Sequence, residues 1–176
     1  MEGRPKCLRA GELMQKNNHS IGNAGEFYVL AQLAQRGYVA GKTDDGQTLI
    51  DVIATDPETL LSVNIQVKST AQFGGYWMTG NKARKSFENL WYVFASLKSP
   101  EEIPEFFIFH SSEVAEGVEE QHQHWLSKPM KDGSPRKSSD IVNRFQPTPK
   151  RLETARNRWD LMFNEPLRQT EAGIPC

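Results

Sequence analysis

The sequence predicts an α/β fold, and three observations support this. Residues 20–37 have the apolar spacing of a helix, residues 49–70 alternate like a two-stranded hairpin, and two later apolar runs have the length of buried strands. A chain of 176 residues is long enough to bury a core of its own. Its charged fraction of 24% is near that of folded globular proteins, which argues against wholesale disorder.

The first predicted helix begins at Ser20 or Asn23, either of which can cap it, and ends at Gly37. At about 100° per residue, Glu26 projects on the same side of this helix as the apolar Leu33. A carboxylate therefore lies on the apolar stripe. Two interpretations are open: Glu26 belongs to a functional site, or it only interacts favourably with the positive end of the helix dipole.

The second arm of the predicted hairpin, residues 61–68, alternates strictly between apolar and polar side chains. This is the pattern of a strand with one buried face. Gln66 and Lys68 consequently share the other face. Lys68 either takes part in chemistry there or simply extends from the strand end into solvent.

In the first arm, residues 49–54, Asp51 interrupts an apolar run. An ionised carboxylate is costly in such surroundings unless it is paired or bound to a metal, so Asp51 is either a satisfied core acid or a functional group. Residues 55–59 supply turn chemistry, and symmetry about this turn places Asp51 opposite Gln66.

Residues 90–97 and 105–110 are apolar, aromatic-rich runs and are predicted to be buried strands. Between the hairpin and the first of these runs, Phe73, Tyr76 and Trp77 stand beside glycines and are followed by a basic KARK segment. Such aromatics either contact nucleic-acid bases or pack in the core.

Two more helices are predicted. One is capped by Ser111 or Ser112 and ends before Pro129, and the other spans residues 149–163. We expect a flexible arm over residues 1–18, one domain over 19–163 and a frayed tail over 164–176.

The formal net charge of -1 gives no global sign of nucleic-acid binding. The charge is segregated, however: residues 101–120 contain seven acids and no Lys or Arg, whereas residues 128–158 contain nine bases against three acids. The basic segment either contacts phosphates or is a solvated surface. Our candidate nucleic-acid contacts are Lys82, Arg84, Lys85, Arg136 and Lys137.

Cys7 and Cys176 are the only cysteines, which excludes a disulfide framework and a cysteine zinc site and fits a reducing compartment. Residues 1–18 lack the apolar core of a signal peptide, and no window approaches the roughly 18 apolar residues of a membrane span. We expect a cytoplasmic protein without a membrane partner.

Taken together, Glu26, Asp51, Gln66 and Lys68 suggest phosphodiester hydrolysis. Asp51 and Glu26 offer anionic oxygens and Gln66 a neutral one, a set of metal ligands that suits Mg²⁺, with Mn²⁺ as an alternative. Lys68 is placed to orient or deprotonate the attacking water, or to stabilise charge on the phosphate. These four residues are the predicted catalytic set.

The segments GNAGEFYVLAQLAQRGY, LIDVIAT and VNIQVKST resemble the PD-(D/E)xK nuclease superfamily, in its variant with Gln in the acidic position of the third motif. The second half, including WYVFASL and PEFFIFHSSEVAEGV, resembles a group of small bacterial nuclease-like proteins. The resemblance covers roughly residues 20–163. It implies a restriction-endonuclease-like core of order αβββαβ around a mixed sheet.

The resemblance also implies that Asp51 is the metal-binding Asp, Gln66 holds the Asp/Glu position, Lys68 is the catalytic Lys and Glu26 is the helix acid. Two positions depart from the pattern. Ile50 stands where the name-giving Pro would be, and Gln66 removes one negative charge from the metal site.

The leading hypothesis is therefore a metal-dependent endonuclease of double-stranded or branched DNA, acting as a homodimer if it cuts both strands. A second hypothesis is a nuclease-like fold that holds nucleic acid or a partner protein without cleaving. The missing charge at Gln66 separates the two. In a third, purely structural interpretation, Glu26, Asp51 and Lys68 matter only for folding.

Overall fold

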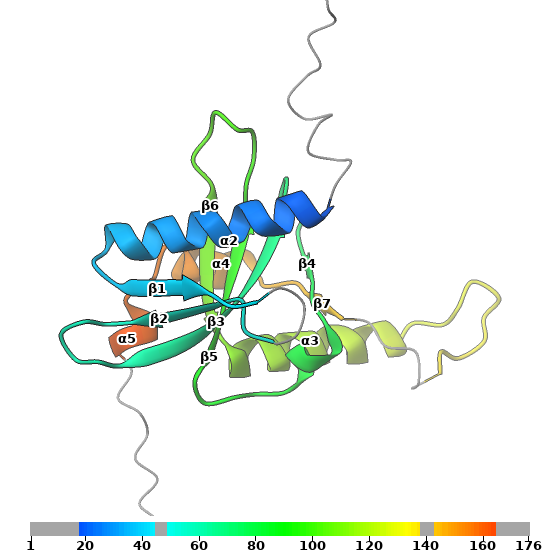
Figure 1. Cartoon of the computed structure of the whole chain (residues 1–176). Helices are drawn as coiled ribbons and strands as arrows, with labels where there is room; N and C mark the ends of the chain where they lie inside the picture. Colours follow the sequence, from blue (N-terminus) through cyan, green and yellow to red (C-terminus); the bar gives the residue numbers. More distant parts are fainter. Residues whose placement is uncertain (1–17, 45–48, 138–142, 165–176) are drawn as a thin grey trace, which may run out of the picture.

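The computed structural model describes residues 18–44, 49–137 and 143–164. Except for one residue each, the arm predicted over residues 1–18 and the tail predicted over 164–176 lie outside this part. Figure 1 shows a twisted central sheet with the long helix α2 on one side, α4 on the other and α3 along its lower end.

The elements follow one another as helix, strands, helix and short closing helices. In chain order they are α2 (Asn18–Gln35), β1 (Val39–Lys42), β2 (Val52–Thr55), β3 (Ser62–Thr70), β4 (Trp77–Met78), the 3-10 helix η1 (Asn81–Arg84), β5 (Leu90–Ser96), β6 (Glu105–His110), α3 (Ser111–Leu126), β7 (Arg144–Phe145), α4 (Pro149–Ala155) and α5 (Leu161–Asn164).

The central sheet has the strand order β1-β2-β3-β5-β6. Neighbouring strands are antiparallel except β3 and β5, which are parallel. A second, two-stranded sheet pairs β4 with β7. The predicted fold class is confirmed: this is an α/β protein with a mixed sheet flanked by helices.

Helix α2 lies very close to β3 because Gly25 faces the strand. A Cβ atom on Gly25 would stand 1.7 Å from the Ser69 hydroxyl oxygen, so no larger residue fits without displacing the helix. The predicted caps Ser20 and Asn23 are wrong, because α2 already begins at Asn18 and both residues lie inside it. The helix ends at Gln35, and Gly37, predicted to terminate it, follows with a φ of 87° that favours glycine. The N–H groups of Gly37 and Tyr38 donate to the carbonyls of Ala34 and Leu33.

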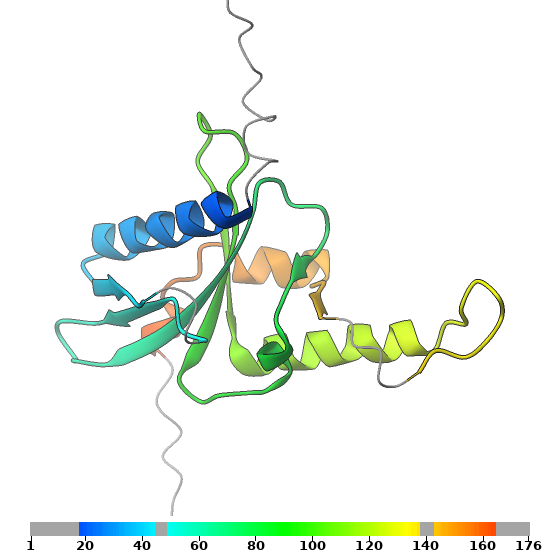
Figure 2. The ribbon, with the colours of Figure 1, turned by 45° about the vertical axis from the view of Figure 1, so that its right-hand side comes forward.

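The two faces of the sheet bury separate apolar clusters. Under α2, Val29 and Leu33 pack on Val63 and Ile65 of the sheet. The opposite face packs mainly aromatic side chains under α3, α4 and β7, a layering that Figure 2 shows from a second direction. None of the helices in the described ranges combines the length and the apolar composition that a membrane span requires.

The connection from β3 to β5 contains β4 and η1, where the αβββαβ order would place a longer helix. Three glycines between residues 74 and 80 disfavour a continuous helix there. Trp77 of this connection is only 2% exposed and stacks on Phe73, with ring centroids 4.2 Å apart. Of the two interpretations of these aromatics, the structure supports core packing for Trp77.

The helix predicted over residues 149–163 is wrong as one continuous element. Helix α4 ends at Ala155, and Arg156 forms a β-bridge with Phe107 of the edge strand β6. Asn157 then takes a positive φ of 54° and donates its N–H to the Phe106 carbonyl at 3.0 Å. Backbone hydrogen bonds to the sheet thus outcompete the helical apolar spacing.

Helix α3 begins where predicted but has a different cap. His110, not Ser111 or Ser112, is the capping residue, and Glu113 accepts the His110 N–H at 3.0 Å to complete a capping box. Ser111 is instead fully buried, and its hydroxyl is satisfied by two hydrogen bonds to the backbone of Phe87 in the preceding loop.

Candidate active site

Asp51 and Gln66 meet at the point where β2 begins beside the middle of β3. Val52 pairs with Ile65, and the Asp51 N–H donates to the Ile65 carbonyl at 2.9 Å, so the next pair in this register is Asp51 with Gln66. The register predicted from symmetry about the turn is confirmed. On the other side, Thr43 donates its N–H to the Asp51 carbonyl at 2.9 Å, which fixes the Asp51 backbone.

The Asp51 carboxylate is held by two donors from β3. Its Oδ2 atom accepts the Val67 N–H at 2.7 Å and the side-chain amide N–H of Gln66. Both of these hydrogen bonds fall on the same oxygen atom. No described residue donates a hydrogen bond to the Oδ1 atom, which is therefore the one that can take another ligand.

Burial is the largest influence on Asp51 and raises its pKa above the usual range. The negative charge of Glu26 acts in the same direction. The Val67 N–H, the positive charge of Lys68 and the Gln66 amide oppose the shift. Glu26, Gln66 and Lys68, all predicted from sequence, thus each act on the Asp51 carboxyl.

Glu26 reaches this region from α2 because Gly25 brings the helix against β3. Its Oε2 atom lies 2.9 Å from the Lys42 ammonium, and both side chains are mostly shielded from solvent. Sequence reasoning missed Lys42. It lies in a short, partly exposed strand, and no local pattern there indicates a partner 16 residues earlier.

Lys68 shares the face of β3 with Gln66, as predicted from the alternation. It is half-buried and forms no ion pair with any described residue. Its charge nevertheless acts on Asp51. An unpaired ammonium at this place is available to an anionic substrate.

Tyr92 is a second neighbour that sequence reasoning missed. It is the parallel β-partner of Gln66 on β5, and it is 1% exposed. Within the described residues its buried hydroxyl has no hydrogen-bond partner, and burial, followed by the charge of Asp51, raises its pKa to about 12. In the sequence Tyr92 is one aromatic in an apolar run, so only the strand pairing shows its position.

The oxygen atoms at this place fit a hard divalent cation. Asp51 Oδ1 and Glu26 are anionic, and the Gln66 amide can present its carbonyl oxygen if it turns over. The described residues contain no cluster of three or more acidic, His or Cys side chains. Two carboxylates suit Mg²⁺, which takes few protein ligands and keeps several waters.

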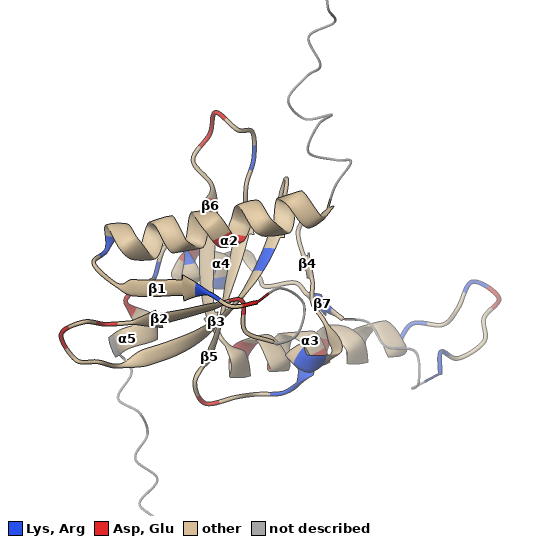
Figure 3. Ribbon diagram, viewed as in Figure 1, with Lys and Arg blue, Asp and Glu red and all other residues tan. Residues whose placement is uncertain are grey.

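The candidate nucleic-acid contacts divide into two groups. Lys82 and Lys85 are exposed around η1 and line a pocket together with Ile50, the residue before Asp51. Arg84, between them, instead forms an ion pair with Glu119 of α3. Figure 3 shows these basic residues in blue on η1 next to α3.

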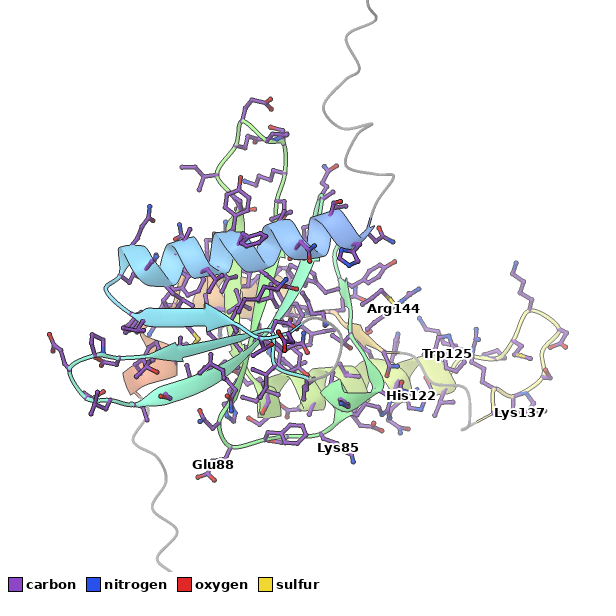
Figure 4. All side chains as sticks on the ribbon, in the orientation of Figure 1. Lys85, Glu88, His122, Trp125, Lys137 and Arg144 are labelled. Carbon is purple, nitrogen blue, oxygen red and sulfur yellow. The ribbon has the colours of Figure 1, made fainter. Side chains whose placement is uncertain are left out.

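Arg136 and Lys137 lie apart from η1, in the loop after α3, where Figure 4 labels Lys137. The Arg136 guanidinium stacks on Trp125 at 4.2 Å and donates to the Lys128 carbonyl at 2.9 Å. Near them, a pocket of about 550 Å³ is lined in part by Trp125, Lys128 and Arg144.

The basic segment after residue 128 is also partly neutralised. Arg156 pairs with Glu105, Arg158 pairs with Asp160, and Arg151 donates to the Glu113 carbonyl. These arginines hold the closing segment in place. The cations left for a ligand are fewer than the nine bases of the sequence suggest.

The chain is similar to the structure of a bacterial homing endonuclease, I-Ssp6803I, with a TM-score of 0.50 over 83% of this chain and 91% of that chain. The fold is nuclease-like. The two sequences are 15% identical, so the likeness concerns the fold. No protein-family model and no curated protein sequence matches this chain.

Proposed function

We propose that this protein is a metal-dependent endonuclease that hydrolyses phosphodiester bonds of DNA. The observation that carries the proposal is the Asp51 carboxylate, held through Oδ2 by β3 and electrostatically coupled to Lys68 and Glu26. A nuclease-like fold and the predicted motif spacing support the same conclusion. The resemblance to the PD-(D/E)xK superfamily stays a prediction.

In this proposal Asp51, Glu26 and Gln66 would hold Mg²⁺ or Mn²⁺. The cation would supply a Lewis acid for the phosphate and acidify an attacking water. Lys68 contacts the scissile phosphate or the water, where its positive charge opposes the negative charge that grows on phosphorus. Burial of Asp51 suits this role, because a desolvated carboxylate binds a cation more strongly than a solvated one.

A second function is favoured by a specific observation. Gln66 is neutral and donates to Asp51, and Lys42 already compensates Glu26. Both features lower the net negative charge available to a cation. They favour a nuclease-like module that binds nucleic acid or a partner protein without cleaving it.

Plasmid nicking tests the proposal. Supercoiled plasmid and branched DNA are incubated with the protein and Mg²⁺ or Mn²⁺, beside Asp51→Ala, Lys68→Ala and the control Ser62→Ala. Ser62 is an exposed residue of the same strand. We expect both site variants to cleave about 100- to 1,000-fold more slowly and the control to match wild type.

Equal nicking by wild type and both site variants would contradict the assigned roles. If the wild type binds DNA and leaves it uncut with either cation, the binding module is the correct function. A cytoplasmic location and a homodimer that cuts both strands remain part of the proposal, and the ratio of nicked to linear plasmid tests the latter.

A further inference from the structure

A pocket of about 380 Å³ is lined by residues of η1, of the loop before β5, of β3 and of the segment that precedes Asp51. Leu49 and Ile50, which precede Asp51 in the chain, form part of its wall. Asn64, another lining residue, is two positions before Gln66 on the same face of β3, about 6.6 Å along the strand. The pocket therefore adjoins the candidate active site on the face that carries Gln66.

The far wall of the pocket is the loop of residues 87–89, and this wall is already fixed. The buried Ser111 hydroxyl donates to the Phe87 carbonyl at 2.6 Å and accepts the Phe87 N–H at 2.8 Å. Asn89 accepts the Asn64 N–H at 3.2 Å and donates its side-chain amide to the Ser62 carbonyl at 3.0 Å. Because these bonds already hold the loop in place, binding of a ligand here would cost little loop entropy.

The pocket is positively charged at its rim. Lys82 and Lys85 line it, no acidic residue in the described ranges does, and neither lysine forms an ion pair with any described residue. Glu88 is an acidic residue that lies in the chain between the lining residues Phe87 and Asn89. In Figure 4, Glu88 and Lys85 lie at opposite ends of the loop, and the Glu88 carboxylate points away from the protein.

The interior is largely apolar, with Leu49, Ile50, Phe87 and Leu90 among the lining residues. The Phe87 side chain is 41% exposed and so remains accessible to a ligand. A ligand that fits both the basic rim and the apolar interior carries a negative charge and a flat apolar group. A nucleotide has both, and in a fully paired duplex the base faces are stacked away from such a pocket.

We propose that this pocket accepts one unpaired nucleotide of the DNA substrate, next to the bond to be cut. Lys82 and Lys85 bind its phosphates, and its base contacts Phe87. This inference rests on the proposed nuclease function and adds the substrate class: DNA with a bulged, flapped or otherwise unpaired nucleotide.

The test is DNA binding in EDTA, where no cleavage occurs. Fluorescence anisotropy compares a labelled hairpin duplex that has a one-nucleotide bulge with the fully paired duplex of the same sequence. We expect the wild type to bind the bulged DNA about 10-fold more tightly, the scale of one base stacked on an aromatic ring. Phe87→Ala should remove most of this preference, and Phe87→Tyr should keep it.

The lysines are tested separately because their effect is independent of the base. The double variant Lys82→Ala/Lys85→Ala should weaken binding of both DNAs and reduce the slope of log K against log salt by about 1.8, from two lost phosphate contacts. The control is Lys98→Ala, compared with each single lysine variant, because Lys98 lies outside the basic segment of residues 128–158. Lys98 lies in the β5–β6 loop, at the opposite end of the sheet from η1 in both ribbon views.

The outcomes separate the two proposals. Equal binding of both DNAs by the wild type, or an unchanged preference in Phe87→Ala with an unchanged salt slope in the lysine variant, overturns the pocket and leaves the nicking result standing. A preference for bulged DNA that depends on Phe87, together with no nicking, supports the pocket and refutes cleavage. No binding of either DNA in EDTA overturns the pocket and leaves cleavage to be decided by the nicking result in Mg²⁺ or Mn²⁺. Melting curves establish that each variant is folded.

Discussion

One face of strand β3 packs Val63 and Ile65 under α2, whereas the other face presents Gln66 and Lys68 to the candidate active site. The packed face is apolar and needs no partner beyond the helix. Next to the other face lie the Asp51 carboxyl, whose pKa is raised, and the buried Tyr92 hydroxyl, which has no hydrogen-bond partner among the described residues. One strand thus supplies stability on one side, and on the other holds polar groups that cost stability.

The largest expected effect is on the packed face. Ile65 is fully buried, so Ile65→Ala should lower the free energy of unfolding by about 3 kcal/mol through lost burial and a cavity. Urea denaturation measures this change. The control is Ile53→Ala, because Ile53 is 43% exposed on the neighbouring strand. A loss below about 1 kcal/mol at Ile65 would show that this face contributes little to stability.

Gln66→Glu should produce the next largest change, on the polar face. The variant loses the donor to Asp51 and places a second carboxylate against it, so in EDTA at pH 7 it should be about 2 kcal/mol less stable. Millimolar Mg²⁺ should restore this loss if the site holds a cation. Ser62→Glu adds the same charge at an exposed position and should show no Mg²⁺ dependence. An equal loss with and without Mg²⁺ would contradict the metal site.

Tyr92→Phe should stabilise the protein. Removing a buried hydroxyl that has no described partner relieves a desolvation cost, for an expected gain of about 1 kcal/mol in the free energy of unfolding. Urea denaturation measures the change in stability, and the nicking rate measures any change in activity. Tyr76→Phe, at a ring 37% exposed, is the matched control and should change neither. A clear destabilisation by Tyr92→Phe would mean that the hydroxyl has a partner in the folded protein.

The smallest expected effect is that of Asp51→Asn on stability. The folded-state pKa of Asp51 is raised, so the charged carboxylate destabilises the fold at pH 7, and Asn should gain about 0.5 kcal/mol there. This gain should shrink as pH falls through the raised pKa and vanish below about pH 4, where the carboxyl is protonated in both states. Unfolding measured from pH 3.5 to 7 tests this.

Asp160→Asn provides the control of opposite sign for that pH series. Its hydrogen bond from Arg158 lowers the pKa of Asp160, so its carboxylate contributes stability that is present above the usual Asp range and lost as pH falls. A gain at Asp51→Asn that persisted at low pH would show that the carboxylate charge is not its cause.

The parts of the fold that the sequence predicts are those with strong local patterns. Strict alternation in residues 61–68 identifies β3 and its two faces, and short apolar runs identify β5 and β6. Symmetry about a short turn is enough to place Asp51 beside Gln66. Each of these inferences uses residues within one strand or within one short hairpin.

The features that the sequence does not predict depend on contacts between residues far apart in the chain. Helix α4 stops where residues 156–157 bond to β6, about 50 positions earlier in the chain, and the helical spacing carries no trace of that competition. The pairs of Lys42 with Glu26 and of Arg84 with Glu119 likewise join separate elements. The KARK segment reads as a uniform basic cluster, although only the fold determines which of its cations are neutralised.

The bond between Asn157 and the Phe106 carbonyl also affects how copies of this chain can associate. With the bridge at Arg156, it occupies part of the outer edge of β6. Among the described residues no segment pairs with the outer edge of β1, at the opposite border of the sheet. A second copy that extended the sheet by strand addition would therefore meet β1, the strand that carries Lys42, and bring two candidate sites to one shared seam.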